Sequence, residues 1–440
     1  MSKIIYLLNG NNDLSQRFKI KFFTSTNILL IIIFITGVAS APLQFAGNRE
    51  VVSLAGEITG DQLTYSENFT LLSRLFNIIL GLLLIFLVTK LYHQKIEVPS
   101  AIRKVIIASA IFLFFNYIVG SAFGTNFGLP KNLYLIFCPL VIMLLLLVKN
   151  ITPDQLLRTF RFTGVIMLGG SIALGILFPD IAYAQDYFAF SFSDSKRLIG
   201  LFSHPSQIGI FALLLLAIEL RTGSLGWRNI VMIIICWSAL VMSVSKTAIA
   251  LAIILLIIHL VSKSKGYVLA ALFIIVSIYA LFKINAHTPT LFNDTSNLST
   301  LTGRTYIWSM VISKWSTNPL FGNGPSFFSG SGKTVFSHAH NIFLQYISDG
   351  GAFGLIGFIA YLTSLFSLAL KNAKRSSFLS IILVLLILLF SMSEPVMRVN
   401  SFIDGSFFVN AFVVLYLCAL ERQRVIKLNT INISYRRSYY

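Results

Sequence analysis

Charged side chains are scarce in this sequence. Asp, Glu, Lys and Arg make up 11% of its 440 residues, whereas roughly 25% is typical of soluble domains. Hydrophobic residues make up 56%. A chain of this composition cannot shield its apolar side chains from water by folding alone. An ordinary soluble domain is therefore excluded, and most of the protein is expected to lie in lipid.

Cysteine and the common catalytic motifs are also scarce. The three cysteines, Cys138, Cys236 and Cys418, all lie inside apolar runs, which predicts small core residues rather than disulfides or metal ligands. No GxSxG elbow, Walker loop or paired-carboxylate motif occurs in the sequence. These absences give little support to serine hydrolysis or to ATP-driven transport.

Apolar runs of about 20 residues recur along nearly the whole chain, and each could cross a hydrocarbon core of about 30 Å as a helix. We predict an all-α polytopic membrane protein with about twelve transmembrane helices. The predicted spans are residues 22–42, 71–90, 105–124, 133–148, 163–179, 206–221, 229–245, 247–262, 266–282, 351–370, 377–393 and 405–421. Because their number is even, both termini are expected on the same side of the membrane.

The net charge of +18 could indicate a nucleic-acid partner or only the topology in the membrane. The distribution of the charge along the chain distinguishes the two. When loops are assigned alternately to the two sides of the membrane, 23 of the 34 Lys and Arg residues but only 5 of the 16 acidic residues lie beside the termini. That side then carries all of the net charge. An excess of Lys and Arg marks the cytoplasmic side, so both termini are predicted in the cytoplasm and no nucleic acid is expected.

The long loops all lie on the outer side in this topology, at residues 43–70, 180–205 and 283–350. Such segments often carry function, so the chemistry is expected there. We divide the chain into N-terminal transmembrane helices (1–189), a central core that includes the loop 283–350 (190–370), and C-terminal transmembrane helices with a basic cytoplasmic tail (371–440).

The largest outer loop is expected to contain a helix of its own. Within residues 303–319, Ile307, Met310 and Val311 recur at helical spacing beside two tryptophans. A helix with such a stripe can lie in the membrane interface. We therefore predict an amphipathic helix on the outer surface of the membrane.

Basic residues also occur on the outer side, against the cytoplasmic bias. Arg197, Lys246 and Arg304 each lie in or beside an outer loop. A cation at the membrane surface is costly to desolvate and needs a reason. An anion is the simplest one, because Arg binds phosphate through a planar fork of donors and Lys binds it as a point charge. Snorkelling toward lipid headgroups is the alternative interpretation of each residue taken alone.

Two histidines lie near the end of the same loop. His340, next to Asn341, could act as a general base because imidazole titrates near neutral pH; a solvated loop histidine is the alternative. His338 and His340 together resemble part of a metal site. However, no third histidine or carboxylate cluster lies nearby in the sequence, so no metal is predicted.

Two glycines follow the histidine at a fixed spacing. His340 and Asn341 are followed by nine residues, Gly351, two residues and Gly354. This pattern resembles the outer-loop signature of the O-antigen ligase/polymerase superfamily, the bacterial membrane glycan transferases that include O-antigen ligases and Wzy-type polymerases. The context is similar too, because the pattern closes the longest outer loop and enters a predicted span.

Three further segments are similar to the same family. Residues 302–304 (Thr-Gly-Arg) resemble its Gly-Arg element, and residues 197–205 resemble its arginine-containing segment before a middle span. Residues 243–247 (Ser-Val-Ser-Lys-Thr) resemble Ser-x-Ser-Arg-Thr but carry Lys246 in place of the arginine. The lysine keeps the charge but lacks the bidentate fork.

The resemblance implies a C-type glycosyltransferase fold and a metal-independent, inverting transfer that needs no cofactor. The reaction would take place on the periplasmic face of the bacterial inner membrane. Its donor would be a glycan on undecaprenyl diphosphate, and its acceptor a sugar on a lipid-linked repeat unit or on lipid A core. Membrane lipids and a chain-length regulator are further candidate partners.

The resemblance also implies roles for individual residues. Arg197 and Arg304, with Lys246, would hold the diphosphate of the donor. His340 would be the catalytic residue that activates the acceptor hydroxyl. Two neighbours would support substrate binding, namely His338 and Asn341.

Three functions stay open at this point. We expect a polymerase of O-antigen, capsule or exopolysaccharide repeat units, partly because of the departure at Lys246. An O-antigen ligase, which moves finished polysaccharide onto lipid A core, is the alternative and would need the same donor site and base. A polysaccharide or lipid transporter or flippase is the alternative of another class, and it would require ionisable residues at mid-membrane, of which the predicted spans hold few.

Overall fold

The computed structural model describes the chain in several segments, and all structural statements below concern these. They are residues 25–41, 50–51, 63–64, 67–92, 98–126, 133–149, 151–184, 197–222, 226–261, 304–328, 338–403 and 405–437.

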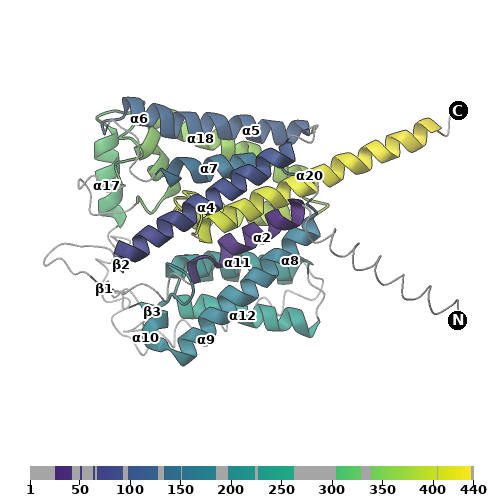
Figure 1. The fold of residues 1–440 in the computed structure, drawn as a ribbon, viewed down its shortest axis with the longest axis horizontal. Helices are drawn as coiled ribbons and strands as arrows, with labels where there is room; N and C mark the ends of the chain where they lie inside the picture. Colours follow the sequence, from purple (N-terminus) through teal and green to yellow (C-terminus); the bar gives the residue numbers. More distant parts are fainter. Residues whose placement is uncertain are drawn as a thin grey trace, which may run out of the picture.

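The described chain is almost entirely helical (Figure 1). Most helices run close to one common direction, whereas α17 (Arg304–Trp315) crosses that direction at one end of the bundle. The other helices are α2 (Ser25–Val38), α4 (Glu67–Tyr92), α5 (Ser100–Leu113), α6 (Gly120–Phe123), α7 (Tyr134–Leu145), α8 (Pro153–Gly164), α9 (Gly170–Leu177), α10 (Pro179–Ala182), α11 (Pro205–Thr222), α12 (Trp227–Ser243), α13 (Lys246–Val261), α18 (Ile342–Lys371), α19 (Leu379–Ser391) and α20 (Gly405–Arg437), with π-helical turns η1 (Phe114–Val119) and η2 (Val165–Gly169).

Two short strand pairs lie at the same end of the bundle as α17 (Figure 1). Each is antiparallel and two residues long. The strands are β1 (Glu50–Val51) with β2 (Leu63–Thr64), and β3 (Tyr183–Ala184) with β4 (Arg197–Leu198). This end therefore gathers segments from all three long loops of the predicted outer side.

The described helices fit a polytopic membrane protein. Five are long and apolar enough to cross a bilayer, and they are Ser100–Phe123, Pro153–Leu177, Pro205–Thr222, Ile342–Lys371 and Gly405–Leu428. Six shorter apolar helices are also present in the described segments, each overlapping a predicted span. The predicted span 266–282 lies outside the described residues. The total of about twelve spans thus stays a prediction.

Two helices form the centre of the bundle. Along α11 and the span at the start of α20, most side chains are buried, as expected for a helix that is apolar all round. The rings of Phe160, Phe211, Phe408 and Phe412 pack together between α8, α11 and α20. Peripheral helices instead expose large apolar side chains, and Ile176 in α9 is 71% exposed. Burial inside and apolar exposure outside is the arrangement expected of a bundle surrounded by lipid.

The helix predicted within residues 303–319 is present as α17. Its apolar side chains Ile307 and Val311 are buried, and they pack with Phe327 and Phe328 of the following turn. The opposite face exposes polar and apolar side chains alike. Its direction across the bundle (Figure 1) is the one that a helix lying in the membrane interface would take.

Helix α18 is broken at Gly351, the first glycine of the signature. Gly351 adopts φ 61° and ψ −152°, a conformation that is essentially restricted to glycine. The predicted span 351–370 corresponds to the part of α18 after this break. Residues 342–350, here named the first half-helix, form a separate helical segment that the sequence analysis did not predict.

The loop after α17 satisfies the backbone groups that the break leaves unpaired. The N–H of Asn323 donates to the carbonyl of Ser348 (2.6 Å), and the N–H of Ala352 donates to the carbonyl of Pro319 (2.9 Å). Within a membrane protein, irregular backbone is tolerated only where it is satisfied in this way. The loop and the break therefore form one unit, and this unit fixes the direction of the first half-helix.

We expect Gly351→Ala to destabilise the protein. A Cβ at this position would lie 2.4 Å from the carbonyl carbon and oxygen of Leu320, and the backbone conformation alone would cost about 1–3 kcal/mol. Thermal unfolding of detergent-purified protein should show a clearly lower melting temperature. Gly169→Ala is the matched control, because its Cβ would meet nothing within 4 Å. Equal melting temperatures for the two variants would contradict this account of the signature glycine.

Candidate active site

A short turn before α18 carries both histidines. The backbone N–H of His340 donates to Nδ1 of His338 (3.3 Å), and the two rings lie edge to face with centroids 4.0 Å apart. His340 adopts φ 50°, a left-handed conformation in which histidine is enriched. The N–H of Ala339 donates to Oε1 of Gln345 (2.9 Å), and its carbonyl accepts from Nε1 of Trp308 (3.0 Å). The turn is therefore held from both sides.

Asn341 is the N-cap of α18. Its Oδ1 accepts from the backbone N–H groups of Phe343 (3.0 Å) and Leu344 (3.2 Å), and its Nδ2 donates to the carbonyl of Met392 (3.3 Å). Such a cap satisfies donors that the first helical turn leaves unpaired. These bonds explain why an asparagine follows the histidine, while its contact with substrate stays a prediction.

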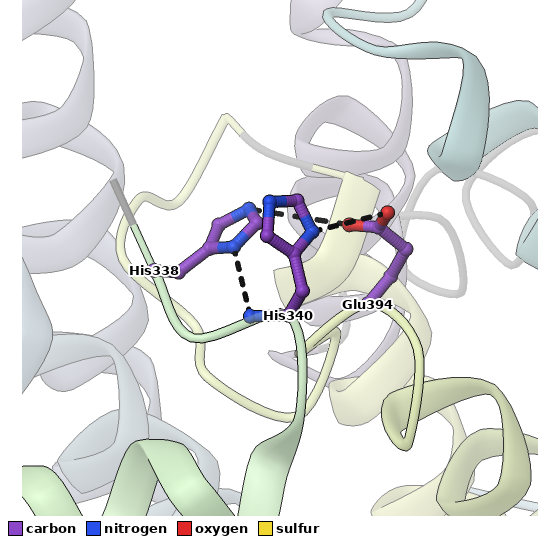
Figure 2. Close-up of side chains that lie close together, drawn as sticks. All are labelled: His338, His340 and Glu394. Carbon is purple, nitrogen blue, oxygen red and sulfur yellow. Dashed lines mark hydrogen bonds and ion pairs between the residues drawn. The ribbon is translucent and has the colours of Figure 1, made fainter. Parts of the chain in front are cut away.

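Glu394 brings three of the predicted site residues together, and Figure 2 shows it with two of them, His338 and His340. It lies in the segment after α19. Its Oε1 is 3.1 Å from Nη2 of Arg304 and 3.4 Å from Nδ1 of His340, and its Oε2 is 3.9 Å from Nε2 of His338. The side chain of Glu394 is only 15% exposed, so these contacts are largely shielded from water.

The polar neighbours of each ring assign its proton position. Because Nδ1 of His338 accepts from the backbone, its neutral form carries the proton on Nε2, which faces Glu394. Nδ1 of His340 faces Oε1 of Glu394, so the carboxylate favours the proton on that nitrogen. This tautomer of His340 leaves the lone pair on Nε2. A carboxylate then faces one ring nitrogen while the other can accept a proton, as in the Ser-His-Asp triad of hydrolases.

Burial and neighbouring charges fix the ionisation of the other two groups. Burial, followed by the charge of His340, lowers the pKa of His338 to about 3, so His338 is neutral near pH 7. Burial, the largest single effect, raises the pKa of Glu394, but the contact with His340 and the charges of His340, His338 and His204 together outweigh it and hold that pKa well below its usual range. Glu394 is therefore a carboxylate at every physiological pH.

The three predicted cations also gather at this site. Arg197 in β4 donates through Nε to the carbonyl of Ser243 (3.2 Å), at the end of α12. A left-handed residue, Val244 (φ 50°), separates α12 from α13, which begins at Lys246. The positive charges of Arg197 and Arg304 both act on the ammonium of Lys246. A lysine whose charge is opposed by two arginines is a site that an anion would stabilise.

His338, His340 and Glu394 also form a candidate metal site. One ligand atom from each lies within 4.8 Å of the other two, and two histidines with one glutamate are a known zinc set. However, the nitrogen of His338 that faces Glu394 carries the proton in the assigned tautomer, and Arg304 already shares the carboxylate. The arrangement thus suits a hydrogen-bonded base better than a metal ion.

Sequence reasoning missed Glu394. Its only signal was an acidic residue in the short outer segment between the predicted spans 377–393 and 405–421. A second unassigned neighbour is His204 at the end of the segment 197–205, whose charge acts on both Glu394 and His338. The carboxylate near the histidines, whose absence argued against a metal, is therefore supplied by a distant part of the chain.

A comparison with known families finds a match for part of the chain. Residues 230–359 match the O-antigen ligase family. The matched segment contains Lys246, Arg304 and the turn with both histidines, whereas Arg197 precedes it and Glu394 follows it. The predicted resemblance to the O-antigen ligase/polymerase superfamily is confirmed. No curated protein matches the chain.

Proposed function

We propose that this O-antigen ligase-like protein transfers a glycan from undecaprenyl diphosphate to an acceptor sugar hydroxyl on the periplasmic face of the bacterial inner membrane. The observation that carries the proposal is the shared contact of Glu394 with His340 and Arg304. It brings a candidate base and a candidate phosphate ligand to the same oxygen, Oε1, of one carboxylate. A transfer that moves a proton and releases a diphosphate needs both.

His340 acts as the general base in this proposal. Its Nε2 accepts the proton of the acceptor hydroxyl while the hydroxyl oxygen bonds to the anomeric carbon of the donor. Proton transfer to a positioned base typically contributes 10²–10⁴-fold to a rate. Glu394 stabilises the imidazolium that forms, because its Oε1 faces Nδ1 of His340.

The cations act on the leaving group. As the bond between the anomeric carbon and the phosphate oxygen breaks, its electron pair goes to the diphosphate, and Arg197, Lys246 and Arg304 stabilise the developing charge. A single displacement of this kind inverts the anomeric centre and requires neither a nucleotide sugar nor a metal. The resemblance supports the same donor chemistry.

Polymerisation of O-antigen, capsule or exopolysaccharide repeat units is our preferred reaction, and ligation of finished polysaccharide to lipid A core is the alternative. Both reactions use the same donor and base. The surface glycan of a deletion strain separates them. Core with a single repeat indicates a polymerase, whereas bare core with accumulated lipid-linked polymer indicates a ligase.

Reconstitution tests the proposal directly. Purified protein in proteoliposomes, given a lipid-linked glycan donor and an acceptor, is expected to form the glycosidic product with release of undecaprenyl diphosphate. Added chelator tests metal independence in the same assay. Vectorial movement of the glycan without product would instead identify a transporter or flippase and overturn the proposal.

Arg304→Lys is expected to reduce transfer about tenfold, because lysine keeps the charge but loses the planar fork that binds phosphate. The loss should appear mainly as a higher KM for the lipid-linked donor. Lys314→Ala is the matched control, since Lys314 is an exposed cation at the other end of α17. Undiminished transfer by Arg304→Lys would rule out bidentate binding of the diphosphate at this position.

A further inference from the structure

The histidine turn is connected to a buried series of polar side chains, Gln345, Asp349 and Arg398, that the proposed mechanism does not use. Oε1 of Gln345 accepts the N–H of Ala339 (2.9 Å), and Nε2 of Gln345 donates to Oδ1 of Asp349 (2.9 Å). Oδ2 of Asp349 is 3.2 Å from Nη2 of Arg398, which also donates to the carbonyl of Pro325 (3.3 Å). These side chains therefore link the amide of Ala339, between His338 and His340, to the segment that carries Glu394.

All three of these side chains are withdrawn from water. Gln345 and Asp349 are fully buried, and Arg398 is 8% exposed. A buried ion pair is a poor source of stability, because desolvation of both charges offsets their attraction. The arrangement instead defines the relative position of the elements that it joins, since each partner can be satisfied in only one geometry.

The segment that carries Glu394 packs alongside the first half-helix and contacts it at three points. Asn341 donates to the carbonyl of Met392 (3.3 Å) at its start, and Tyr346 donates through its hydroxyl to the carbonyl of Met397 (3.3 Å) near its middle. The pair between Asp349 and Arg398 is the third point, at the end of the half-helix. Glu394 lies between the first and second points along the chain. The alignment of the two segments thus determines where its carboxylate meets His340.

We propose that Gln345, Asp349 and Arg398 are positioning residues that set the contact between His340 and Glu394. This inference rests on the proposed function, in which that contact orients the base. Gln345 has the central place, because its amide alone can both accept from the turn and donate to the carboxylate. The three residues touch neither substrate nor reacting atoms and act through the geometry of His340.

Gln345→Met tests the inference, because methionine keeps the buried volume and removes both hydrogen bonds. We expect kcat to fall about tenfold while KM for the lipid-linked donor is unchanged, since the cations that hold the donor are untouched. A second variant, Glu394→Gln, makes the test specific. If Gln345 acts through the His340–Glu394 contact, the double variant should be no slower than Glu394→Gln alone.

A matched control lies at the opposite end of α18. Asn372 is also fully buried, and its Nδ2 donates to Oε2 of Glu421 (3.0 Å). Asn372→Leu removes a buried hydrogen bond of the same kind without touching the histidine turn. It should lower the melting temperature and leave kcat unchanged. A loss of kcat with Asn372→Leu equal to that with Gln345→Met would show that both residues are merely structural, and would overturn the inference.

Hydrogen exchange tests the inference independently of glycan transfer. The amide of Ala339 donates to Gln345. The peptide that contains this amide should therefore exchange faster in Gln345→Met. The increase should be at least about tenfold, which corresponds to the free energy of one buried hydrogen bond. Unchanged exchange would contradict the positioning role. If exchange accelerates but wild-type protein transfers no glycan, the proposed function fails while the structural link stands.

Discussion

His340→Ala is expected to lower the rate of glycan transfer by about 10²–10⁴-fold, the range that a positioned general base contributes. The substitution removes the only imidazole in the described site whose Nδ1 faces Oε1 of Glu394, so the acceptor hydroxyl would have to lose its proton to water. KM for the lipid-linked donor should change little, because Arg197, Lys246 and Arg304 remain. Initial rates of product formation in proteoliposomes measure both quantities.

Two matched histidines make the result specific. His259→Ala replaces an imidazole at the far end of α13 from Lys246 and should leave transfer intact. His338→Ala removes the ring beside His340 and should cost less than His340→Ala, since His338 is neutral and only supports its neighbour. Wild-type transfer by His340→Ala, in protein that folds and reaches the membrane, would end the assignment of the base.

Glu394→Gln should produce the second large loss, about 10²–10³-fold in kcat, because it removes the charge that stabilises the imidazolium. The glutamine is nearly the same size, but its amide can place N–H donors toward Nδ1 of His340 and favour the wrong tautomer. Glu394→Asp keeps the charge on a shorter side chain and should retain part of the activity. Full activity in Glu394→Gln would show that the carboxylate has no part in the reaction.

The same variant has a pH signature in stability. Folding lowers the pKa of Glu394 below its ordinary value of 4.5, so the unfolded chain binds this proton more readily. The stabilisation from the carboxylate is therefore fully present at neutral pH and is lost as the pH falls below about 4.5. Wild-type protein should melt at a higher temperature than Glu394→Gln at pH 7, and the difference should narrow at pH 4.

The sequence predicted much of the site because its signals are local. His338, His340 and Asn341 are neighbours, and Asn341 caps the helix that immediately follows. The cations Arg197, Lys246 and Arg304 come from separate segments, but a shared side of the membrane was enough to group them. In the structure the charges of Arg197 and Arg304 both act on Lys246.

Glu394 and the buried series of polar side chains could not be predicted in this way. Glu394 is separated from His340 by the whole of α18 and α19, and a single glutamate after a predicted span has no distinctive pattern. Asp349 and Gln345 lie in a segment that the sequence analysis treated as loop. Their helical spacing acquires a meaning only when the break at Gly351 turns this segment into a separate half-helix.

The sequence by itself determined that the chain is a helical membrane protein, where most of its helices lie, and which segment resembles the O-antigen ligases. The membrane character and the helices follow from composition and from the lengths of apolar runs, which are local properties of the sequence. The resemblance follows from short motifs, such as His340 and Asn341 followed by Gly351 and Gly354. Only the tertiary structure decided which carboxylate meets His340 and how the histidine turn is held. Those contacts join residues far apart along the chain, so they depend on how α18 and α19 pack against each other, and no local pattern records that packing.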